Sequence, residues 1–397
     1  MLNNLPLVVF SHLRWDFVYQ RPQHLLARLA RKRQVFFIEE PVQDFENAPH
    51  LEISNPAPNV VVVRPHTPSY SWGYTGDQVA HMTPLVADFV EQQELTDYVV
   101  WLYTPMALPL AQTLRPRTVV FDVMDELSAF AGAPQEMKDL EAATLAWADV
   151  VFTGGPSLYK AKLGRHRNLH CFPSSVDAAH FAQARSVGEA PDQANLPHPR
   201  LGFYGVIDER MDLGLLDFLA ASHPDWQIVM VGPVVKIDWA WLPKRPNLHF
   251  LGQRQYAELP SYLAGWDVCL LPFALNESTR FISPTKTLEY MAAELPIVST
   301  PITDVAEPYG HIVYLGTTQE EFLAACEHAL TAPAEERERR VQQMRQVLAS
   351  TSWDHTVAAM ERLIDEAVTL KNPQSGVHSG RDFAGDSLPS SRVSMSM

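Results

Sequence analysis

Residues 267–300 read DVCLLPFALNESTRFISPTKTLEYMAAELPIVST and contain a complete strand–helix–strand unit. The runs 267–273 and 296–300 are short and apolar, as is typical of strands buried on both faces of a parallel sheet. Between them, residues 283–294 carry apolar side chains at helical spacing and begin with Ser-Pro, which favours a helix start. This stretch predicts an α/β fold built on a parallel sheet.

The same alternation of strand and helix patterns occurs along most of the chain. In the N-terminal half, the predicted strands are residues 5–10, 34–40, 59–65, 98–103, 118–125 and 149–154. In the C-terminal half, the further predicted strands are residues 200–207, 226–232, 248–253 and 311–316. We therefore expect two Rossmann-like, doubly wound parallel-sheet domains that face each other across a cleft.

Changes in composition indicate where these domains begin and end. The stretch AQARSVGEAPDQANLPHP (182–199) has no apolar periodicity and is the predicted linker between an N-terminal domain (1–181) and a C-terminal domain (200–350). Residues 351–371 form a predicted last helix. Residues 372–397 are rich in Ser and Gly and are predicted to be disordered.

Charge and cysteine usage argue against several classes of protein. Apolar residues make up 46% and charged residues 19% of the chain, which is typical of a folded globular protein. The 46 acidic residues exceed the 31 basic ones, and the resulting net charge of −15 disfavours nucleic acid as a partner. The three cysteines form no CxxC pair, which favours a reducing compartment and argues against a disulfide framework or a zinc site. No apolar run is long enough to span a bilayer and no signal-peptide pattern is found, so we expect a cytoplasmic protein.

The helix start near Ser283 is the most informative candidate site. Ser283 is the expected N-cap and Pro284 the first helical residue, which leaves the amides of Thr285–Thr287 unpaired. The first turn carries Lys286 instead of an acid, so the amides, the helix dipole and the ammonium predict a phosphate site. Glu289, one turn on, is placed to bind sugar hydroxyls. A surface helix with an ordinary Lys–Glu pair explains the same residues equally well.

A second loop follows the first strand of the C-terminal half, at GFYGVIDERMDL (202–213). Gly205 permits a close approach of backbone or ligand, and Arg210 is placed to bind a diphosphate with two parallel bonds. In the alternative interpretation, Asp208 caps the next helix and Arg210 pairs with a nearby acid.

Two loops of the N-terminal half also follow strands. In SHLRWDFVYQRPQHL (11–25), Arg21, Gln23 and Trp15 are expected at the mouth of the cleft, although aromatic residues in such a run are more often part of the core. In TVVFDVMDELSAF (118–130), Asp122 and Asp125 are candidate bases or hydroxyl-orienting groups, and they could equally cap the next helix.

Other catalytic templates are missing from the sequence. We find no GxSxG elbow, no GxxxxGK[ST] phosphate loop, no GxGxxG after the first strand and no HExxH. Hydrolase, kinase and dehydrogenase functions are therefore disfavoured.

Taken together, these motifs resemble the GT-B glycosyltransferases, specifically retaining glycosyltransferases of family 4. The stretch SPTKTLEYMAAELPIVSTPITDV (283–305) is similar to the donor-site signature of that family. WDFVYQRPQHLLARLA (15–30) and VVFDVMDELSAF (119–130) are similar to a bacterial branch associated with cell-surface polysaccharide assembly. The resemblance covers residues 5–370, and it implies that the last helix crosses back to the N-terminal domain.

The resemblance implies a role for each candidate residue. Arg210 and Lys286 would neutralise the donor diphosphate, Glu289 would accept from the ribose hydroxyls, and residues 253–259 would lie against the base. Asp125, or else Asp122, would contact the acceptor hydroxyl. Further donor contacts would come from Gly205, Ser283, Thr285 and Thr287. The resemblance implies transfer with retention and without a metal or any other cofactor, because basic side chains and helix dipoles stabilise the leaving diphosphate.

Two positions depart from the family pattern. Phe281 stands where the family usually has an acid, eight residues before Glu289. Glu294 replaces a glycine in the turn after the helix, so this turn must avoid a positive φ or tolerate one at some cost.

We therefore expect transfer of a hexose from a nucleotide diphosphate sugar to a polysaccharide or lipid-linked glycan acceptor. The helix 22–33 has a basic edge at Arg28 and Arg31–Arg33, which suits peripheral contact with the inner face of the plasma membrane, or is simply a solvated face. Two alternatives remain open from the sequence: a sugar-nucleotide epimerase on the same fold, and a catalytically degenerate nucleotide-binding accessory subunit.

Overall fold

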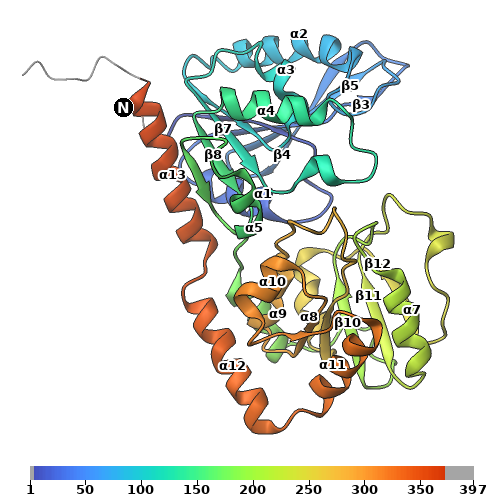
Figure 1. The fold of residues 1–397 in the computed structure, drawn as a ribbon. Coiled ribbons are helices and arrows are strands. Elements are labelled where there is room, and N and C mark those ends of the chain that lie inside the picture. Colours follow the sequence, from blue (N-terminus) through green and yellow to red (C-terminus); the bar gives the residue numbers. More distant parts are fainter. Residues whose placement is uncertain (1–3, 372–397) are drawn as a thin grey trace, which may run out of the picture.

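A computed structural model describes residues 4–371 as two α/β domains (Figure 1). The sheet of the N-terminal domain has nine strands in the order β3-β5-β2-β1-β6-β7-β8-β9, and β4 pairs with β5 beside this path. All of its strand pairs are parallel except β4–β5. Its strands are β1 (Leu7–Ser11), β2 (Val35–Glu39), β3 (Val42–Gln43), β4 (His50–Ala57), β5 (Val60–Thr67), β6 (Val99–Leu102), β7 (Thr118–Val123), β8 (Val150–Thr153) and β9 (Leu169–Cys171).

The C-terminal sheet has six strands in the order β12-β11-β10-β13-β14-β15, all paired in parallel. The expected α/β fold with two parallel-sheet domains is confirmed. The strands are β10 (Arg200–Tyr204), β11 (Gln227–Val231), β12 (Leu248–Gly252), β13 (Val268–Leu271), β14 (Ile297–Ser299) and β15 (Tyr314–Leu315).

Helices cover the sheets and connect their strands. In the N-terminal part these are α1 (Arg21–Leu29), α2 (Asp77–Gln92), η1 (Pro105–Ala107), α3 (Leu108–Ala111), η2 (Leu127–Ala129), α4 (Met137–Trp147), α5 (Pro156–Lys162), α6 (Ala178–Ala182) and η3 (Gln183–Arg185). In the C-terminal part they are α7 (Leu213–Ser222), η4 (Trp239–Trp241), η5 (Tyr256–Glu258), α8 (Leu259–Leu263), α9 (Thr285–Ala292), α10 (Thr303–Tyr309), α11 (Gln319–Thr331), α12 (Ala334–Ala349) and α13 (Trp353–Leu370).

The period of two along each buried strand separates two apolar layers in the N-terminal domain. In β1, Val8 and Phe10 join one core cluster, whereas Leu7 and Val9 join the other. The C-terminal domain has one core of its own. The parallel sheets are therefore buried on both faces, as their continuous apolar runs predict.

Strand β4 was not expected from the sequence. Most of its residues are exposed, so it has no apolar alternation to reveal it, and Pro56 argues against a central strand. The strand tolerates proline because it lies at an edge, and its register with β5 shifts between Ser54 and Ala57.

Helix α13 lies against the N-terminal domain, although it follows α12 on the C-terminal domain (Figure 1). Ser352 caps it by accepting from the His355 amide at 3.2 Å. Trp353, Met360 and Ile364 are buried in the N-terminal core. The chain thus returns to the domain in which it began.

The basic edge of residues 22–33 is paired with acids of α13. Arg31 pairs with Asp354 at 2.8 Å and Lys32 with Glu361 at 2.6 Å, both across to α13. Arg33 also pairs with Glu361, at 3.2 Å. The acids of α13 therefore offset much of the charge of this basic edge, which weakens the case for contact with a lipid surface. Among the residues that the structure describes, no helix has the length and apolar character needed to cross a bilayer.

The two domains contact each other directly beside the cleft. Oδ1 of Asp304, in α10, accepts from the Ser157 amide at the start of α5 at 3.0 Å, and this contact is buried. Lys160 and Glu307 form an ion pair across the same boundary at 2.7 Å. The predicted disordered stretch 372–397 lies outside the described residues.

Candidate functional site

A cleft between the domains is lined by the loops that follow the strands of both sheets. The N-terminal domain contributes residues 18–21, Met124, Asp125 and Ser174. The C-terminal domain contributes Phe203–Val206, Arg210, Val231–Pro233, Gln253, Arg254, Tyr256, Leu259, Phe273, Ile282–Lys286 and Glu289. Because parallel strands present their carboxyl ends at one edge, this cleft is where such sheets bind ligands.

Lys286 is the central cation of the cleft. It lies in the first turn of α9, and no described carboxylate forms a salt bridge with it. Burial lowers the pKa of its ammonium, and the nearby Glu289 opposes that shift. A mostly buried cation without an ion-pair partner is costly unless an anion joins it. Glu289, Asp208 and Asp125 are near enough to favour the charged form, but none of them forms a salt bridge with it, so an anion can still bind at this helix start.

Gly205 makes room for this lysine. Its φ is +136°, a conformation that residues with a Cβ rarely adopt. A Cβ built there would lie 2.1 Å from Cε of Lys286 and 2.7 Å from its Nζ. The positive φ therefore favours glycine at the end of β10, and a Cβ there would force the Lys286 side chain to shift.

Arg210 lies in the same cleft but already has a partner. Its Nε and Nη2 donate to both oxygens of Asp208, at 2.7–3.1 Å. Its guanidinium carbon is 5.4 Å from the ring centre of Phe130 in the other domain. The ion-pair alternative for Arg210 is thus seen, although Asp212, not Asp208, caps the next helix by accepting from Leu215.

Helix α9 begins one residue later than predicted. Pro284 has ψ of 117° and is the N-cap, so Ser283 lies before the helix. The Thr287 amide donates to the Pro284 carbonyl at 3.2 Å, and its side chain is buried away from the cleft. The expectation of a free Thr287 amide is wrong, which leaves the amides of Thr285 and Lys286 at the open end of the helix.

Glu289 does not form the ordinary surface pair with Lys286. It is 7% exposed, and its Oε2 accepts from the Tyr204 hydroxyl at 2.6 Å. Burial raises the pKa of this carboxyl, and Lys286 partly opposes the shift. Tyr204 holds one oxygen of Glu289 at the wall of the cleft. Tyr204 was not among the predicted site residues, because a tyrosine at the end of an apolar strand is typical of the core.

The two predicted acids of the N-terminal domain have different environments. Asp125 lines the cleft, and burial raises the pKa of its carboxyl while Arg210 opposes that shift. Asp122 is fully buried and accepts from Nε and Nη2 of Arg21 at 3.1 and 2.9 Å. Arg21 also donates to the Phe172 carbonyl at 2.7 Å. Asp122 and Arg21 therefore brace the cleft wall, and Asp122 is not open to a substrate.

Gln23 and Trp15 do not line the cleft, contrary to expectation. The Gln23 Nε2 donates to the carbonyls of Trp15 and Val18 at 2.8 and 3.0 Å. The Trp15 ring packs edge-on against Phe37, with 5.2 Å between ring centres. The amphipathic spacing of α1 turns Gln23 inward, so these residues shape the loop whose residues 18–20 reach the cleft.

The loop after β12 reaches the cleft, where the base was expected. Gln253, Arg254, Tyr256 and Leu259 all line it. Tyr256 also packs on Tyr19 of the other domain, with ring centres 4.8 Å apart. Aromatic side chains from both domains therefore close one end of the cleft.

The two departures from the family pattern have structural roles. Phe281 packs against the core of the N-terminal domain and does not line the cleft. Glu294 adopts φ of +60°, so the turn tolerates a positive φ. Its carboxylate accepts from Nε and Nη2 of Arg345 at 2.8 and 2.9 Å and also pairs with Arg185. These ion pairs tie the turn to α12 and to η3.

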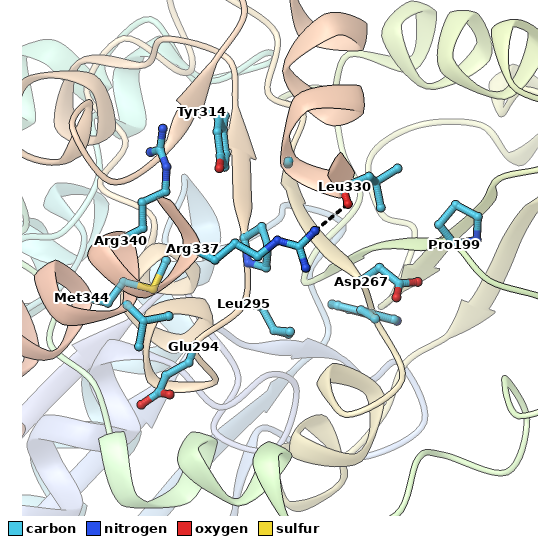
Figure 2. Close-up of a pocket in the computed structure, with 13 residues that line it drawn as sticks. Pro199, Asp267, Glu294, Leu295, Tyr314, Leu330, Arg337, Arg340 and Met344 are labelled. Atoms are coloured by element: carbon cyan, nitrogen blue, oxygen red, sulfur yellow. Dashed lines mark hydrogen bonds between the residues drawn. The ribbon is translucent and has the colours of Figure 1, made fainter. Parts of the chain in front are cut away.

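A second groove lies at the end of the C-terminal sheet opposite the cleft, between the amino ends of the strands and α12 (Figure 2). Its volume is about 550 Å³, but its charged side chains are already engaged. Arg337 donates to the Leu330 carbonyl at 2.7 Å, and the Arg340 guanidinium carbon lies 3.8 Å from the ring centre of Tyr314. Pro199 and Pro296 come just before β10 and β14, so this groove is at the amino ends of the strands, where such sheets do not bind ligands.

Comparison with known proteins adds a family match to this geometry. Residues 198–332 match the family described as "Glycosyl transferases group 1". The chain is 25% identical over 232 residues to a protein of Bacillus subtilis (strain 168) named "Putative teichuronic acid biosynthesis glycosyltransferase TuaH". The match covers 55% of this chain and 57% of that protein, so the chain spans little more than half the length of this relative.

Solved structures share the fold over nearly the whole chain. A sucrose-phosphate synthase from Thermosynechococcus elongatus has a TM-score of 0.71 at 16% identity, and the match covers 92% of this chain and 100% of that one. A structure described as "Trehalose-6-phosphate from E. coli bound with UDP-2-fluoro glucose" has a TM-score of 0.68 at 14% identity. The match covers 91% of this chain and 99% of that one. The GT-B architecture expected from the sequence is therefore confirmed.

Proposed function

We propose that this chain, whose C-terminal domain matches the group 1 glycosyltransferases, transfers a hexose from a nucleoside diphosphate sugar to a glycan acceptor. The observation that carries this proposal is the unpaired Lys286 ammonium at the open start of α9, within the interdomain cleft. Phosphate groups are the anions that helix starts and lysines bind together. A donor diphosphate at this point would place its nucleoside toward Tyr256 and its sugar toward the N-terminal domain.

Charge neutralisation would come from the protein itself. Lys286 and the α9 amides would bind one phosphate, and the Arg210 guanidinium, positioned by Asp208, would approach the other. Glu289 would accept from the ribose hydroxyls through the oxygen that Tyr204 does not hold. These groups are fixed before the reaction, so they would stabilise the charge that develops on the leaving diphosphate without a metal ion.

The transfer itself would retain the configuration of the sugar. The bond between the sugar and the diphosphate breaks, the acceptor oxygen bonds to the same face of the sugar, and the leaving phosphate takes the acceptor proton. Asp125 would orient the acceptor hydroxyl from the N-terminal wall of the cleft. We place this reaction in the cytoplasm, because the three free cysteines suit a reducing compartment.

The acceptor we propose is a growing polysaccharide or its lipid-linked precursor. Support comes from the Bacillus subtilis relative, whose name links it to teichuronic acid biosynthesis. An epimerase is not favoured, because the family and this relative both carry glycosyltransferase names. Incubation with donor alone separates the two activities: an epimerase converts the donor sugar without an acceptor.

A thermal-shift screen of nucleoside diphosphates, with EDTA present, tests the donor site. We expect at least one diphosphate to raise the melting temperature of the wild type and to have no effect on Lys286→Ala. The matched control is Lys244→Ala, because Lys244 is an exposed lysine of the same domain outside the cleft. Equal stabilisation of Lys286→Ala and the wild type would overturn the proposal.

A further inference from the structure

A histidine pair lies on the sheet edge formed by β3, β4 and β5, and none of its residues lines the interdomain cleft. The antiparallel register of β4 and β5 places His50 directly opposite His66. The two imidazole rings stack with 4.6 Å between centres and an angle of 15°. Asp44 follows β3 and approaches the same point. One nitrogen of each ring and one Asp44 oxygen all lie within 4.8 Å of one another.

The hydrogen bonds around the rings leave one nitrogen of each without a hydrogen-bond partner among the described residues. Nε2 of His66 lies 3.0 Å from Oε2 of Glu52, so it is the donor, and Nδ1 keeps its lone pair. That Nδ1 faces the Asp44 carboxylate at 3.8 Å. Nδ1 of His50 lies 3.0 Å from the Ala48 carbonyl, so its Nε2 is the nitrogen with a lone pair. Each ring therefore keeps one nitrogen for a ligand bond, and one nitrogen of each ring lies within 4.8 Å of an Asp44 carboxylate oxygen.

Asp44 is held in place by its own loop. Its Oδ1 accepts from the amides of Glu46 and Asn47 at 3.0 and 3.1 Å, and its Oδ2 accepts from Nδ2 of Asn47 at 2.9 Å. Metal-binding histidines typically donate their second nitrogen to a carboxylate or a backbone carbonyl, and metal-binding carboxylates are themselves hydrogen-bonded. All three groups have such an outer partner here.

We propose that Asp44, His50 and His66 bind a divalent transition-metal ion of the zinc type. Two imidazoles and one carboxylate match the ligands that zinc prefers, and a water would complete a tetrahedral site. Ligand bonds of about 2.1 Å require the three atoms to close to roughly 3.4 Å apart. The His50 side chain is exposed and can make that movement, because only the hydrogen bond to the neighbouring Ala48 and the stacking on His66 hold it.

Such an ion would join three separate parts of the sheet edge. It would tie the loop after β3 to β4 and β5. Phe45, next to Asp44, packs against Tyr70 with 4.4 Å between ring centres, and both side chains are exposed. Binding would therefore also order an aromatic pair at this edge. The site is separate from the donor cleft and does not depend on the proposed transferase activity.

Calorimetric titration of the full chain with ZnCl₂ tests the proposal. We expect about one equivalent to bind the wild type and His50→Ala or His66→Ala to lose it. Glu52→Ala should weaken binding about 10- to 100-fold, because it removes only the outer partner of His66. His223→Gln is the matched control: His223 faces Asp225 at 3.6 Å and Glu327 at 2.9 Å but has no second histidine beside it. This variant should bind zinc as the wild type does.

Cobalt absorption tests the same site without relying on the heat of binding that calorimetry measures. The absorption of a tetrahedral Co²⁺ site should appear in the wild type and in His223→Gln and be missing from His50→Ala. Melting curves without metal show that each variant is folded. Equal zinc binding by the wild type and His50→Ala, or no zinc binding by the folded wild type, would overturn the proposal.

Discussion

Replacing Asp122 with asparagine should destabilise the N-terminal domain strongly. The side chains of Asp122 and Arg21 are 0% and 3% exposed and form a bidentate pair. Removing one partner of a buried ion pair typically costs about 3–5 kcal/mol, because the other charge is left uncompensated. For a domain of this size, we expect the melting temperature to fall by roughly 6–20 °C.

The two neighbouring acids make this prediction specific. Asp125 forms no salt bridge with any residue between 4 and 371, and burial already disfavours its charged form. Asp125→Asn should therefore change the melting temperature by no more than about 2 °C, within the range of substitutions that break no structural feature. It should nevertheless lower glycosyl transfer at least tenfold if Asp125 orients the acceptor hydroxyl, a contribution within the range of general acid–base groups.

Differential scanning fluorimetry and a transfer assay measure both quantities in the same preparations. The double variant Arg21→Met with Asp122→Leu removes the two charges together, so it should melt above Asp122→Asn. If Asp122→Asn melts like the wild type and loses transfer, Asp122 has a catalytic role and the bracing interpretation is wrong.

Three further perturbations follow from single contacts. Gly205→Ala should weaken nucleoside diphosphate binding in calorimetry, because a Cβ at φ +136° is strained and would move the Lys286 side chain; unchanged affinity would refute this. Burial raises the pKa of Glu40 from 4.5 to about 7, so the folded protein holds this proton more tightly than the unfolded chain does. The stability of the fold is therefore highest below pH 4.5 and falls as the pH rises through 7. Glu40→Gln should remove that fall in denaturation curves, which amounts to about 3 kcal/mol; an unchanged pH profile would count against it. Glu294→Ala keeps the positive φ but loses the pairs with Arg345 and Arg185, and it should cost about 1–2 kcal/mol in urea unfolding. Glu294→Gly loses the same pairs but should be nearly neutral, because glycine removes the strain.

Several features could be predicted because they depend on local patterns. Short apolar runs predicted the strand–helix–strand unit at 267–300. Lys286 was a candidate site residue because a helix start usually carries an acid in its first turn. Gly205 followed from its place after a strand. These predictions needed no knowledge of the partner segment, and the structure brings Lys286 and Gly205 together in the cleft.

Other features depend on contacts that are distant in sequence. Asp122 and Asp125 follow the same strand, and only the contact with Arg21, 101 residues away, separates their roles. The basic edge of residues 22–33 looked free because its acids lie in α13, more than 300 residues later. His50 and His66 are joined by the pairing of β4 with β5, and β4 itself has no apolar alternation.

Phe281 and Glu294 depart from the family pattern, and they were the reason for considering a degenerate accessory subunit. The contacts of these two residues argue against that alternative. Phe281 packs into the core of the opposite domain, and Glu294 binds two arginines at the far end of α9. Neither contact occupies the pocket around Lys286. A site that had lost its ligand would no longer need a partly buried lysine without a salt bridge at a helix start, because that lysine costs stability. The chain carries this cost together with the Gly205 conformation that accommodates it, which favours continued binding of an anion in the cleft.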